Sequence, residues 1–441
     1  MDSLLGTRSP RVPSIRLSLA AALAGLLCSA FGSGEIVVTT AVELQAALTP
    51  ANAGQRILVR AGVYDIGQAL IVPDDATLVG EGRMTFDDAG LPTGIAPNGR
   101  TVLRSTTALV GDVLTLGDGS TLLNLVIEDA LGRQASNPPL AGNAVAVSSR
   151  APGDFVSALI VECEILNPNP PGIAAQGPSG RALVGITRNP NLGSDPPPHD
   201  GSTVLVEMKR SIAHTPGGGS GVFLINFSSH SEVRLVLRRN VLAGLDASGG
   251  VSRPDAVTGA RTSIQSVGNL YRSESATPGL IGWSLIGGGT APIPGLASKA
   301  STFNSLDLHS NDDTIDGFTT GVSATGGYRP NALSESSSSN GIDLDVHGLT
   351  LQRTAADFLL FGARSLVDDV SPGDENTLRM LLRKATGSGP RANQYADSWA
   401  PSGVGLGIGN ELRITGTEKA FVRSNDDVDP IPPAEFFTEQ K

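Results

Sequence analysis

A short unit of alternating apolar and polar residues recurs along this chain and limits the folds open to it. Nine copies start 29 to 45 residues apart, and their first and third residues are almost always apolar. Side chains in a β-strand alternate between two faces, so these two positions would point the same way. The copies start at Leu125, Val161, Val206, Leu235, Ile264, Leu306, Ile342, Leu378 and Leu412. The pattern predicts one strand per repeat, each with one buried face.

A second apolar run follows in several repeats, 16 to 20 residues after the start of the first. These runs start at Val145, Val222, Ile281, Val322 and Phe358. The segments between the runs are rich in Gly, Pro and Ser and vary in length, as at 167–172, 194–199, 286–295 and 334–339. Constant strands joined by variable loops are typical of a solenoid, in which successive repeats stack on one another.

Two other repeat or all-β architectures fit the sequence less well. Leucine-rich repeats have a shorter period of about 20–29 residues and a fixed grid of Leu and Asn that is missing here. A β-sandwich needs antiparallel hairpins, yet the hairpin-forming pair Asn-Gly occurs only at 98–99 and 340–341. Aromatic residues make up only 4% of the chain, which argues against a large globular core. A parallel β-helix fits best.

The stretch from Arg56 to Gly82 shows the same organisation near the N-terminus. It holds three short apolar runs, at 57–59, 70–72 and 77–79, separated by Gly, Pro or Asp. We interpret these runs as three strands that form one coil. Upstream, Thr40 and Glu43 fit a capping box that opens a short helix.

This N-terminal region resembles the start of a right-handed parallel β-helix of the pectin-lyase-like superfamily, which includes pectate lyases, chondroitinase B and alginate lyases. The matching elements are a helix at 43–47, Ala53-Gly54, a strand at 57–59, Gly62-Val63-Tyr64 and Gly80-Glu81-Gly82. The resemblance covers about a tenth of the chain. It implies an all-β, single-stranded right-handed parallel β-helix with a short N-terminal capping helix. It does not fix an activity, because the superfamily mixes lyases, hydrolases, adhesins and inert shafts.

The first thirty residues predict a secretory signal. Three arginines precede an apolar run at 17–27, and the small residues Cys28-Ser29-Ala30 follow it. Cleavage would follow Ala30; retention of the run as an anchor is the alternative. We therefore divide the chain into a signal at 1–30, a β-helix at 31–425 and a tail at 426–441. The mature protein would be secreted, periplasmic or on the cell surface, with no membrane span after cleavage and with Cys163 as an unpaired core residue.

The charge and motif content exclude several functional classes. The net charge of −11 makes nucleic acid an unsuitable partner, because phosphate binding needs clustered Lys and Arg. No Gly-rich loop has the dinucleotide or P-loop pattern, and no His or Cys pair has zinc spacing. Asn240 and Asn269 occupy matching places in successive repeats, which predicts a structural Asn ladder at a bend.

The best candidate site lies where two successive repeats carry acidic and His residues on their outward positions. The repeat spacing places Asp307 beside Asp343 and His309 beside Asp345, with His347 further along the second strand. Two carboxylates about 4.8 Å apart repel by roughly 3–4 kcal/mol at an effective dielectric near 20. This repulsion must be relieved by a raised pKa, a bound cation or side-chain rotation into water. We predict acid–base chemistry at these five residues, or Ca²⁺ held by Asp307 and Asp343; a solvated polar ladder is the alternative.

A second candidate is the basic pair Lys209 and Arg238, which we predict to be neighbours on adjacent strands, with Arg210 and Arg239 beside them. Cationic side chains suit the carboxylates of acidic sugars, and the resemblance implies lyases that use Arg or Lys as the base. A surface ion-pair column that includes Glu164 is the alternative interpretation.

We therefore expect a protein that binds, and as a lyase or glycoside hydrolase cleaves, an extracellular and acidic polysaccharide along the side of the solenoid. A non-catalytic surface or adhesion shaft is the rival. The polygalacturonase pattern of the superfamily includes Gly-His-Gly and Arg-x-Lys, and this chain has neither. No residue of the superfamily can thus be assigned a catalytic role here, and calcium is the only cofactor that the sequence suggests.

Overall fold

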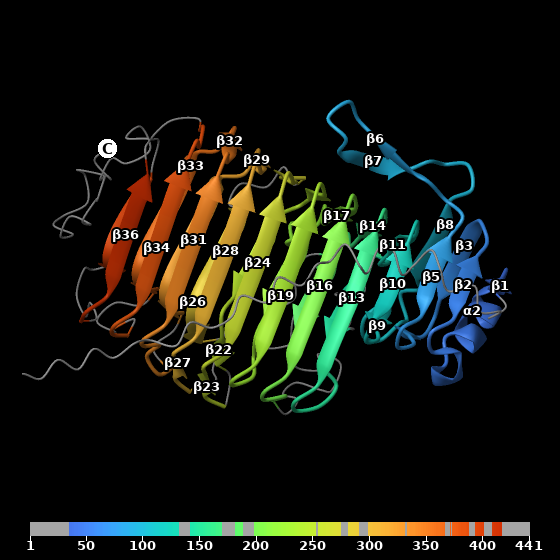
Figure 1. Cartoon of the computed structure of the whole chain (residues 1–441), viewed down its shortest axis with the longest axis horizontal. Coiled ribbons are helices and arrows are strands. Elements are labelled where there is room, and N and C mark those ends of the chain that lie inside the picture. Colours follow the sequence, from blue (N-terminus) through green and yellow to red (C-terminus); the bar gives the residue numbers. More distant parts are fainter. Residues whose placement is uncertain are drawn as a thin grey trace, which may run out of the picture. The chain divides into compact units, whose positions relative to one another are not determined.

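The chain forms a right-handed parallel β-helix, seen in a computed structural model (Figure 1). The structure describes residues 35–131, 142–169, 181–187, 198–252, 255–274, 281–290, 299–330, 333–366, 371, 373–387, 393–400 and 408–416. The predicted signal segment at 1–30 and the predicted tail at 426–441 lie outside these residues. Strands of the described solenoid run from Ile36 to Gly416, within the range that the sequence predicted for the β-helix.

Three long parallel sheets make up the solenoid, and sheet A faces the viewer in Figure 1. Sheet A contains β1 (Ile36–Val38), β2 (Arg56–Val59), β5 (Thr77–Gly80), β10 (Ser120–Leu123), β13 (Phe155–Val161), β16 (Thr203–Lys209), β19 (Glu232–Arg238), β24 (Arg261–Val267), β28 (Ser305–Asn311), β31 (Gly341–His347), β34 (Thr377–Arg383) and β36 (Glu411–Gly416). Sheet B contains β3 (Gly62–Ile66), β8 (Thr101–Ser105), β11 (Val126–Glu128), β14 (Glu164–Leu166), β17 (Ile212–His214), β20 (Val241–Leu242), β25 (Leu270–Arg272), β29 (Thr314–Asp316) and β32 (Thr350–Gln352). Sheet C contains β4 (Leu70–Val72), β9 (Leu114–Leu116), β12 (Val145–Ser148), β15 (Leu183–Ile186), β18 (Val222–Ile225), β21 (Leu245–Ser248), β22 (Val251–Ser252), β26 (Ile281–Thr290), β30 (Thr320–Arg329), β33 (Ala356–Ser365) and β35 (Gln394–Trp399).

Each coil takes one strand from each sheet, in the order A, B, C. The first coil is β2, β3 and β4, and β5 then pairs with β2 in sheet A, with Ile57 opposite Leu78. The interpretation of the three N-terminal apolar runs as one coil was therefore wrong, because the third run opens the next coil. The strand that the sequence missed is β3, whose only buried side chains are Tyr64 and Ile66.

A short helix covers the first coil, as predicted. Helix α2 (Ala41–Ala47) starts at Thr40, whose hydroxyl accepts a hydrogen bond from the backbone of Glu43, while the Glu43 carboxylate accepts one from Thr40 in return. This capping box satisfies orphan amides of the first turn. Leu44 and Ala47 are buried against the core, so the helix covers apolar surface that no further coil covers. A 3₁₀ turn, η1 (Pro50–Asn52), leads from the helix towards β2.

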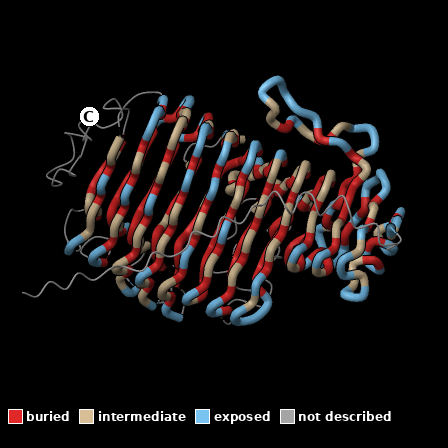
Figure 2. The backbone as a smooth tube through the Cα atoms, in the orientation of Figure 1, coloured by how far each residue is buried: buried red, intermediate tan, exposed pale blue. Residues whose placement is uncertain are grey.

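The core is a continuous column of inward side chains. Figure 2 shows buried and exposed residues alternating along the strands of sheet A, as the period-two pattern predicted. Trp283 and Tyr271 are fully buried in this column and make an edge-to-face contact with ring centroids 5.5 Å apart. Fully burying one aliphatic side chain contributes about 1.5–3 kcal/mol. Because the column is continuous, the inward side chains of each coil are buried by the coils on either side.

The predicted strands are present, but the register of three repeat units was misplaced. Leu125 belongs to the corner before β11 in sheet B, since Val126 pairs with Glu164. Val161 pairs with Lys209, three positions from the predicted Val206. Ile264 pairs with Leu308 and not with Leu306. The second run of each repeat does form sheet C, although β26 extends to Thr290 through part of the loop predicted at 286–295.

Cys163 faces the interior, as predicted, but its neighbours differ from those expected. It is fully buried, and burial raises the pKa of its thiol to about 12. Its backbone amide donates to the Ser211 hydroxyl, and its coil neighbour on the other side is Leu125. The third positions of the aligned repeats that start at Leu125, Val161 and Val206 would have put it between Ile127 and Met208. The reason is that Cys163 occupies a corner of the coil, not the strand of sheet A.

A two-residue corner joins sheet A to sheet B in coil after coil. The first corner residue has positive φ, which the backbone needs for the sharp bend. These residues are Asn124, Glu162, Arg210, Arg239, Gly268, Asp312 and Gly348. The second residue stacks on its counterpart. The amide of Asn240 donates to Asn269, 2.9 Å away, and the amide of Asn269 donates to Asp313, 3.1 Å away, which confirms the predicted Asn ladder.

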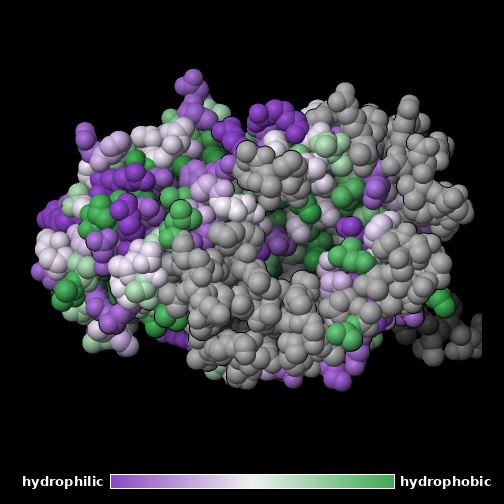
Figure 3. Space-filling model, turned by 180° about the vertical axis from the view of Figure 1, so that it is seen from behind, coloured by the Kyte–Doolittle hydropathy of each residue, from purple (hydrophilic) through white to green (hydrophobic). Residues whose placement is uncertain are grey.

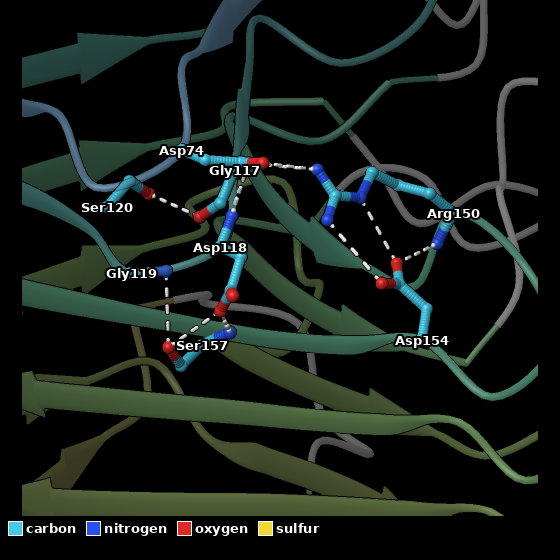
Figure 4. A network of polar contacts seen from close by, with 8 residues as sticks. All are labelled: Asp74, Gly117, Asp118, Gly119, Ser120, Arg150, Asp154 and Ser157. Atoms are coloured by element: carbon cyan, nitrogen blue, oxygen red, sulfur yellow. Dashed lines mark hydrogen bonds and ion pairs between the residues drawn. The ribbon is translucent and has the colours of Figure 1, made fainter. Parts of the chain in front are cut away.

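The corner between sheets C and A uses two further devices. In the later coils Asn304, Asn340, Asn376 and Asn410 form a second ladder, with side-chain amides donating over 3.0 to 3.1 Å. In the early coils Arg150 bridges Asp74 and Asp154, while Asp118 accepts hydrogen bonds from Ser157 (Figure 4). Neither arrangement could be predicted from the sequence, because the contacts that join different coils link residues 34 to 76 positions apart.

Between β5 and β8 the connection from sheet A to sheet B is much longer than two residues and forms a hairpin outside the solenoid. It consists of β6 (Met84–Phe86) and β7 (Pro92–Ile95), the antiparallel pair of the described chain. Met84 and Ile95 pack on the outward side chains of sheet B, including Val126 and Ile212. The hairpin, at the upper right of Figure 1, therefore buries apolar side chains on the outer face of sheet B.

Replacing an inward residue of the column should prevent folding. Leu308 is fully buried, and Leu308→Asp would place an unpaired charge in the column, which costs several kcal/mol. Gln265→Asp, at an exposed position of the adjacent strand, is the matched control. We expect the control to keep a cooperative thermal transition and Leu308→Asp to lose it. A normal transition in both variants would contradict the assigned facing of β28.

The buried end of the Asn ladder should make stability depend on pH. Burial raises the pKa of Asp313, although hydrogen bonds from Ser310 and Asn269 oppose the shift. A raised pKa in the folded state stabilises the protein fully below the unfolded-state pKa, and this contribution is lost as pH rises through the folded-state pKa. Asp313→Asn removes the titration. The melting temperature of the variant minus that of the wild type should therefore increase from about pH 4 to pH 7; a constant difference would contradict this account.

Candidate functional site

A shallow groove crosses the outward face of sheet A between β24 and β36. Its volume is about 450 Å³. It is lined by Arg261, Asp307, His309, Asp343, Leu344, Asp345, Arg379, Met380, Leu381, Arg413 and Thr415. Four of the five residues predicted for acid–base chemistry are among them. The strand register places carboxylates on β28 and β31 and guanidinium groups on β34 and β36.

The predicted pair of neighbouring carboxylates is present, and a cation relieves their repulsion. Asp307 lies opposite Asp343 in the register of β28 and β31. Arg261, on the preceding strand, donates to Asp307 Oδ2 from Nε at 3.0 Å and from Nη2 at 2.7 Å. The sequence analysis left three ways to relieve the repulsion, and the structure adds a fourth, a guanidinium group of the protein itself. The sequence did not reveal Arg261, because the misplaced register put Ile264 two positions away from its true partner.

The two His residues of the patch have different surroundings. His309 Nδ1 lies 3.8 Å from Asp345 Oδ2, which is longer than a hydrogen bond but within ion-pair range when His309 is protonated. His347 lies at the end of β31, two residues after Asp345, and its Nδ1 is 2.9 Å from Asn311 Oδ1. It does not line the groove. Of the two, His309 is the better placed for proton transfer to a ligand in the groove.

The geometry offers a divalent cation few ligands. Within the described residues there is no cluster of three or more His, Cys, Asp or Glu side chains suited to a metal. Ca²⁺ prefers six to eight oxygen ligands. Asp307 and Asp343 would supply two carboxylates, and Asp307 is already bound to Arg261. The calcium site stays a prediction that rests on these two residues alone.

The basic pair is also present on sheet A. Lys209 lies opposite Arg238 in the register of β16 and β19. Lys209 Nζ is 2.8 Å from Glu207 of its own strand, and Arg210 pairs with Glu162. The column of alternating charges expected with Glu164 was wrong: Glu164 lies in sheet B, where it binds Arg100. Assignment of Lys209 and Arg238 to substrate binding stays a prediction.

Sequence reasoning missed a group of aromatic and charged residues on the outward face of sheet C. Arg364 lies over the rings of Phe361 and Trp399, with its guanidinium carbon 5.2 and 4.9 Å from their centroids. Half-buried Asp246 lies on the same face, and burial raises the pKa of its carboxyl. The residues come from coils far apart in the sequence. A usable signal was the clustering of Phe, Tyr and Trp into the second run of the last repeats, in a chain with only 4% aromatic residues.

Comparison with solved structures finds similarity to three proteins of different function. The catalytic unit of a GH87 α-1,3-glucanase from Streptomyces thermodiastaticus matches with a TM-score of 0.37 and 13% identity, over 91% of this chain and 72% of that one. A mannuronic acid-specific family 6 polysaccharide lyase from human gut microbiota matches with 0.31 and 13%, over 90% and 88%. PfbA, a surface adhesin of Streptococcus pneumoniae, matches with 0.32 and 12%, over 88% and 89%.

At 12–13% identity and TM-scores of 0.31 to 0.37, these likenesses assign no function to this chain. No protein-family model and no curated protein matches the chain. Among the described residues no helix is long and apolar enough to cross a membrane. The function must be argued from the surface of this solenoid.

The bridge between Arg261 and Asp307 yields a testable prediction. Arg261→Gln should lower the melting temperature at pH 7 by about a degree or two, because it leaves Asp307 beside Asp343 without its cation and exposed ion pairs are weak. Adding Asp307→Asn should restore the loss, since it removes the repulsion. Arg234→Gln, at another exposed arginine of sheet A, is the control. Equal effects in the single and double variants would contradict the bridge.

Proposed function

We propose that this protein binds an extracellular polysaccharide along the groove of sheet A. The observation that supports the proposal is the groove of about 450 Å³ lined by Asp307, His309, Asp343 and Asp345. It spans five adjacent strands, a distance of about 19 Å at the usual strand spacing. An extended polymer lying along the solenoid would meet a new row of side chains at each strand.

The charges of the groove suggest how such a chain would be oriented. Carboxylates stand on the β28 and β31 side, and Arg379 and Arg413 stand on the β34 and β36 side. Carboxylates accept hydrogen bonds from sugar hydroxyl groups, whereas guanidinium groups bind carboxylates. An acidic sugar would therefore place its carboxylate towards Arg379 and Arg413, with its hydroxyl groups towards Asp343 and Asp345.

We propose His309 and Asp345 as the groups that would transfer protons if the ligand is cleaved. His309 carries the imidazole among the groove-lining residues, and an imidazole can both accept and donate a proton. Asp345, 3.8 Å from its Nδ1, would orient the ring. Catalytic hydrogen bonds are often long without substrate and shorten in the complex. A non-catalytic adhesion shaft is the rival function, and the same groove would serve it by binding alone.

The test uses the purified full chain and a panel of acidic and neutral polysaccharides, with and without Ca²⁺. Binding is measured by calorimetry, and cleavage by the release of reducing ends or of unsaturated products. Asp343→Asn should weaken binding about tenfold or more, whereas Asn311→Asp, outside the groove lining, should not. His309→Ala should abolish cleavage and leave binding within about threefold.

Three outcomes separate the alternatives. Binding without cleavage, sensitive to Asp343→Asn, would favour the adhesion shaft. Absence of binding to every polysaccharide would overturn the proposal. A rise in melting temperature with Ca²⁺ that Asp307→Asn/Asp343→Asn removes would add the predicted metal, because a ligand that binds only the folded state stabilises it.

A further inference from the structure

The outward face of sheet C carries a row of four residues that faces away from the groove of sheet A. In the strand register Gly289 of β26, Tyr328 of β30, Arg364 of β33 and Trp399 of β35 lie side by side. Gly289 has no side chain, so within this row the side chain of Tyr328 is flanked by that of Arg364 alone. Figure 3, which views the molecule from the side opposite to Figure 1, shows hydrophobic and hydrophilic residues mixed on that side.

Arg364 is the unusual member of this row. Its guanidinium group lies over Phe361 and Trp399, whose ring centroids are 6.0 Å apart. Phe361 is 1% exposed, and Arg364 is half-buried. Among the described residues no carboxylate pairs with Arg364, and its buried Nε has no hydrogen-bond acceptor there. Burial accordingly lowers the pKa of the guanidinium, and only the nearby Tyr328 opposes the shift.

An arginine in such surroundings lacks a counter-ion. A desolvated charge is costly unless a partner of opposite sign neutralises it. Asp246, an acidic residue of sheet C, interacts with Arg181 and accepts a hydrogen bond from Ser284. Burial raises the pKa of Tyr328, and Asp246 adds to that shift while Arg364 opposes it, so Tyr328 lies within reach of both charges. The face thus holds a cation that no described carboxylate neutralises, in a protein of net charge −11.

We propose that Arg364, with Tyr328 and Trp399, binds the carboxylate of an acidic sugar at a site separate from the groove of sheet A. The planar guanidinium fork matches a carboxylate in a bidentate arrangement, and stacking between two rings holds that fork in one orientation. The aromatic rings provide apolar area for the face of a sugar, and the Tyr328 hydroxyl provides a hydrogen-bond partner. Aromatic walls with a few fixed polar groups are typical of small-molecule sites.

The chain offers a direct optical probe of this site. It has two Trp residues, of which Trp283 is fully buried in the core and Trp399 is half-buried beside Arg364. A ligand on Arg364 should therefore alter the emission of Trp399 and protect it from a soluble quencher. We would titrate the full chain with oligogalacturonate, with the same oligomer after chemical reduction of its carboxylates, and with dextran sulfate. Oligogalacturonate should change the emission, and the reduced oligomer should not.

Variants test the role of each group. Arg364→Gln should weaken oligogalacturonate binding at this site, measured by the change in Trp399 emission, at least tenfold. Arg364→Lys should weaken it less, because charge is kept while the planar fork is lost. Trp399→Phe should remove the optical response and retain binding. Arg234→Gln is the matched control at a surface arginine of sheet A and should bind as the wild type does. If Arg364→Gln loses its thermal transition, the Arg364→Lys and Trp399→Phe variants decide the question.

The result that would overturn the proposal is equal binding of the intact and reduced oligomers, or wild-type affinity in Arg364→Gln. Stronger binding of dextran sulfate than of oligogalacturonate would overturn the assignment to carboxylates. Asp343→Asn should leave the Trp399 response unchanged. Failure of this site and failure of the groove of sheet A are therefore distinguishable in the same set of titrations.

Discussion

The structure depends on the stacking of each inward side chain on its counterpart in the next coil. Parallel pairing fixes this relation: once Leu306 pairs with Ile342, every later residue of both strands is paired as well. If the pairing of one strand slipped by one residue, all of its inward side chains would point to the solvent. The repeating apolar positions thus act together, and the free energy of folding comes from burial between coils, because an isolated coil would leave its inner face exposed to water.

Corners maintain that register where the strands end. At the A–B corner one residue with positive φ makes the bend, and the next residue bonds to the coils on either side, as Asn240 and Asn269 do. A side-chain amide both donates and accepts, so one Asn can satisfy groups above and below it. Asp313 ends this ladder, and its ionised carboxylate can only accept hydrogen bonds. Because the side chain is fully buried, its charged form is poorly solvated, and this raises its pKa. The C–A corner repeats the device with Asn304 and its partners.

The sequence predicted the fold class and most of the inward positions, because period-two alternation is a local signal. Asp307 beside Asp343 and His309 beside Asp345 followed correctly from a regular 36-residue repeat. The sequence could not predict partners brought together by coils of irregular length. Arg261 lies 46 residues before Asp307, and the 44-residue step from Ile264 to Leu308 has no counterpart in the later repeats. Strands of two to five residues, as in sheet B, carry too few apolar positions to be distinguished from corners.

The three outward faces differ in how much the fold constrains them. Two-residue corners join sheets A and B in most coils, and the long insertion described there, the β6–β7 hairpin, packs back on the outer face of sheet B. Sheet C is bordered on both sides by connections of variable length, as between Ile186 and Thr203 or between Ser365 and Thr377. Length can vary at those borders without changing the inward column. Arg364 lies on this face as a desolvated cation without a described counter-ion, stacked on Phe361 and Trp399. The proposed sugar carboxylate would supply the missing counter-ion, and the two rings would hold the guanidinium group in the plane that binds it.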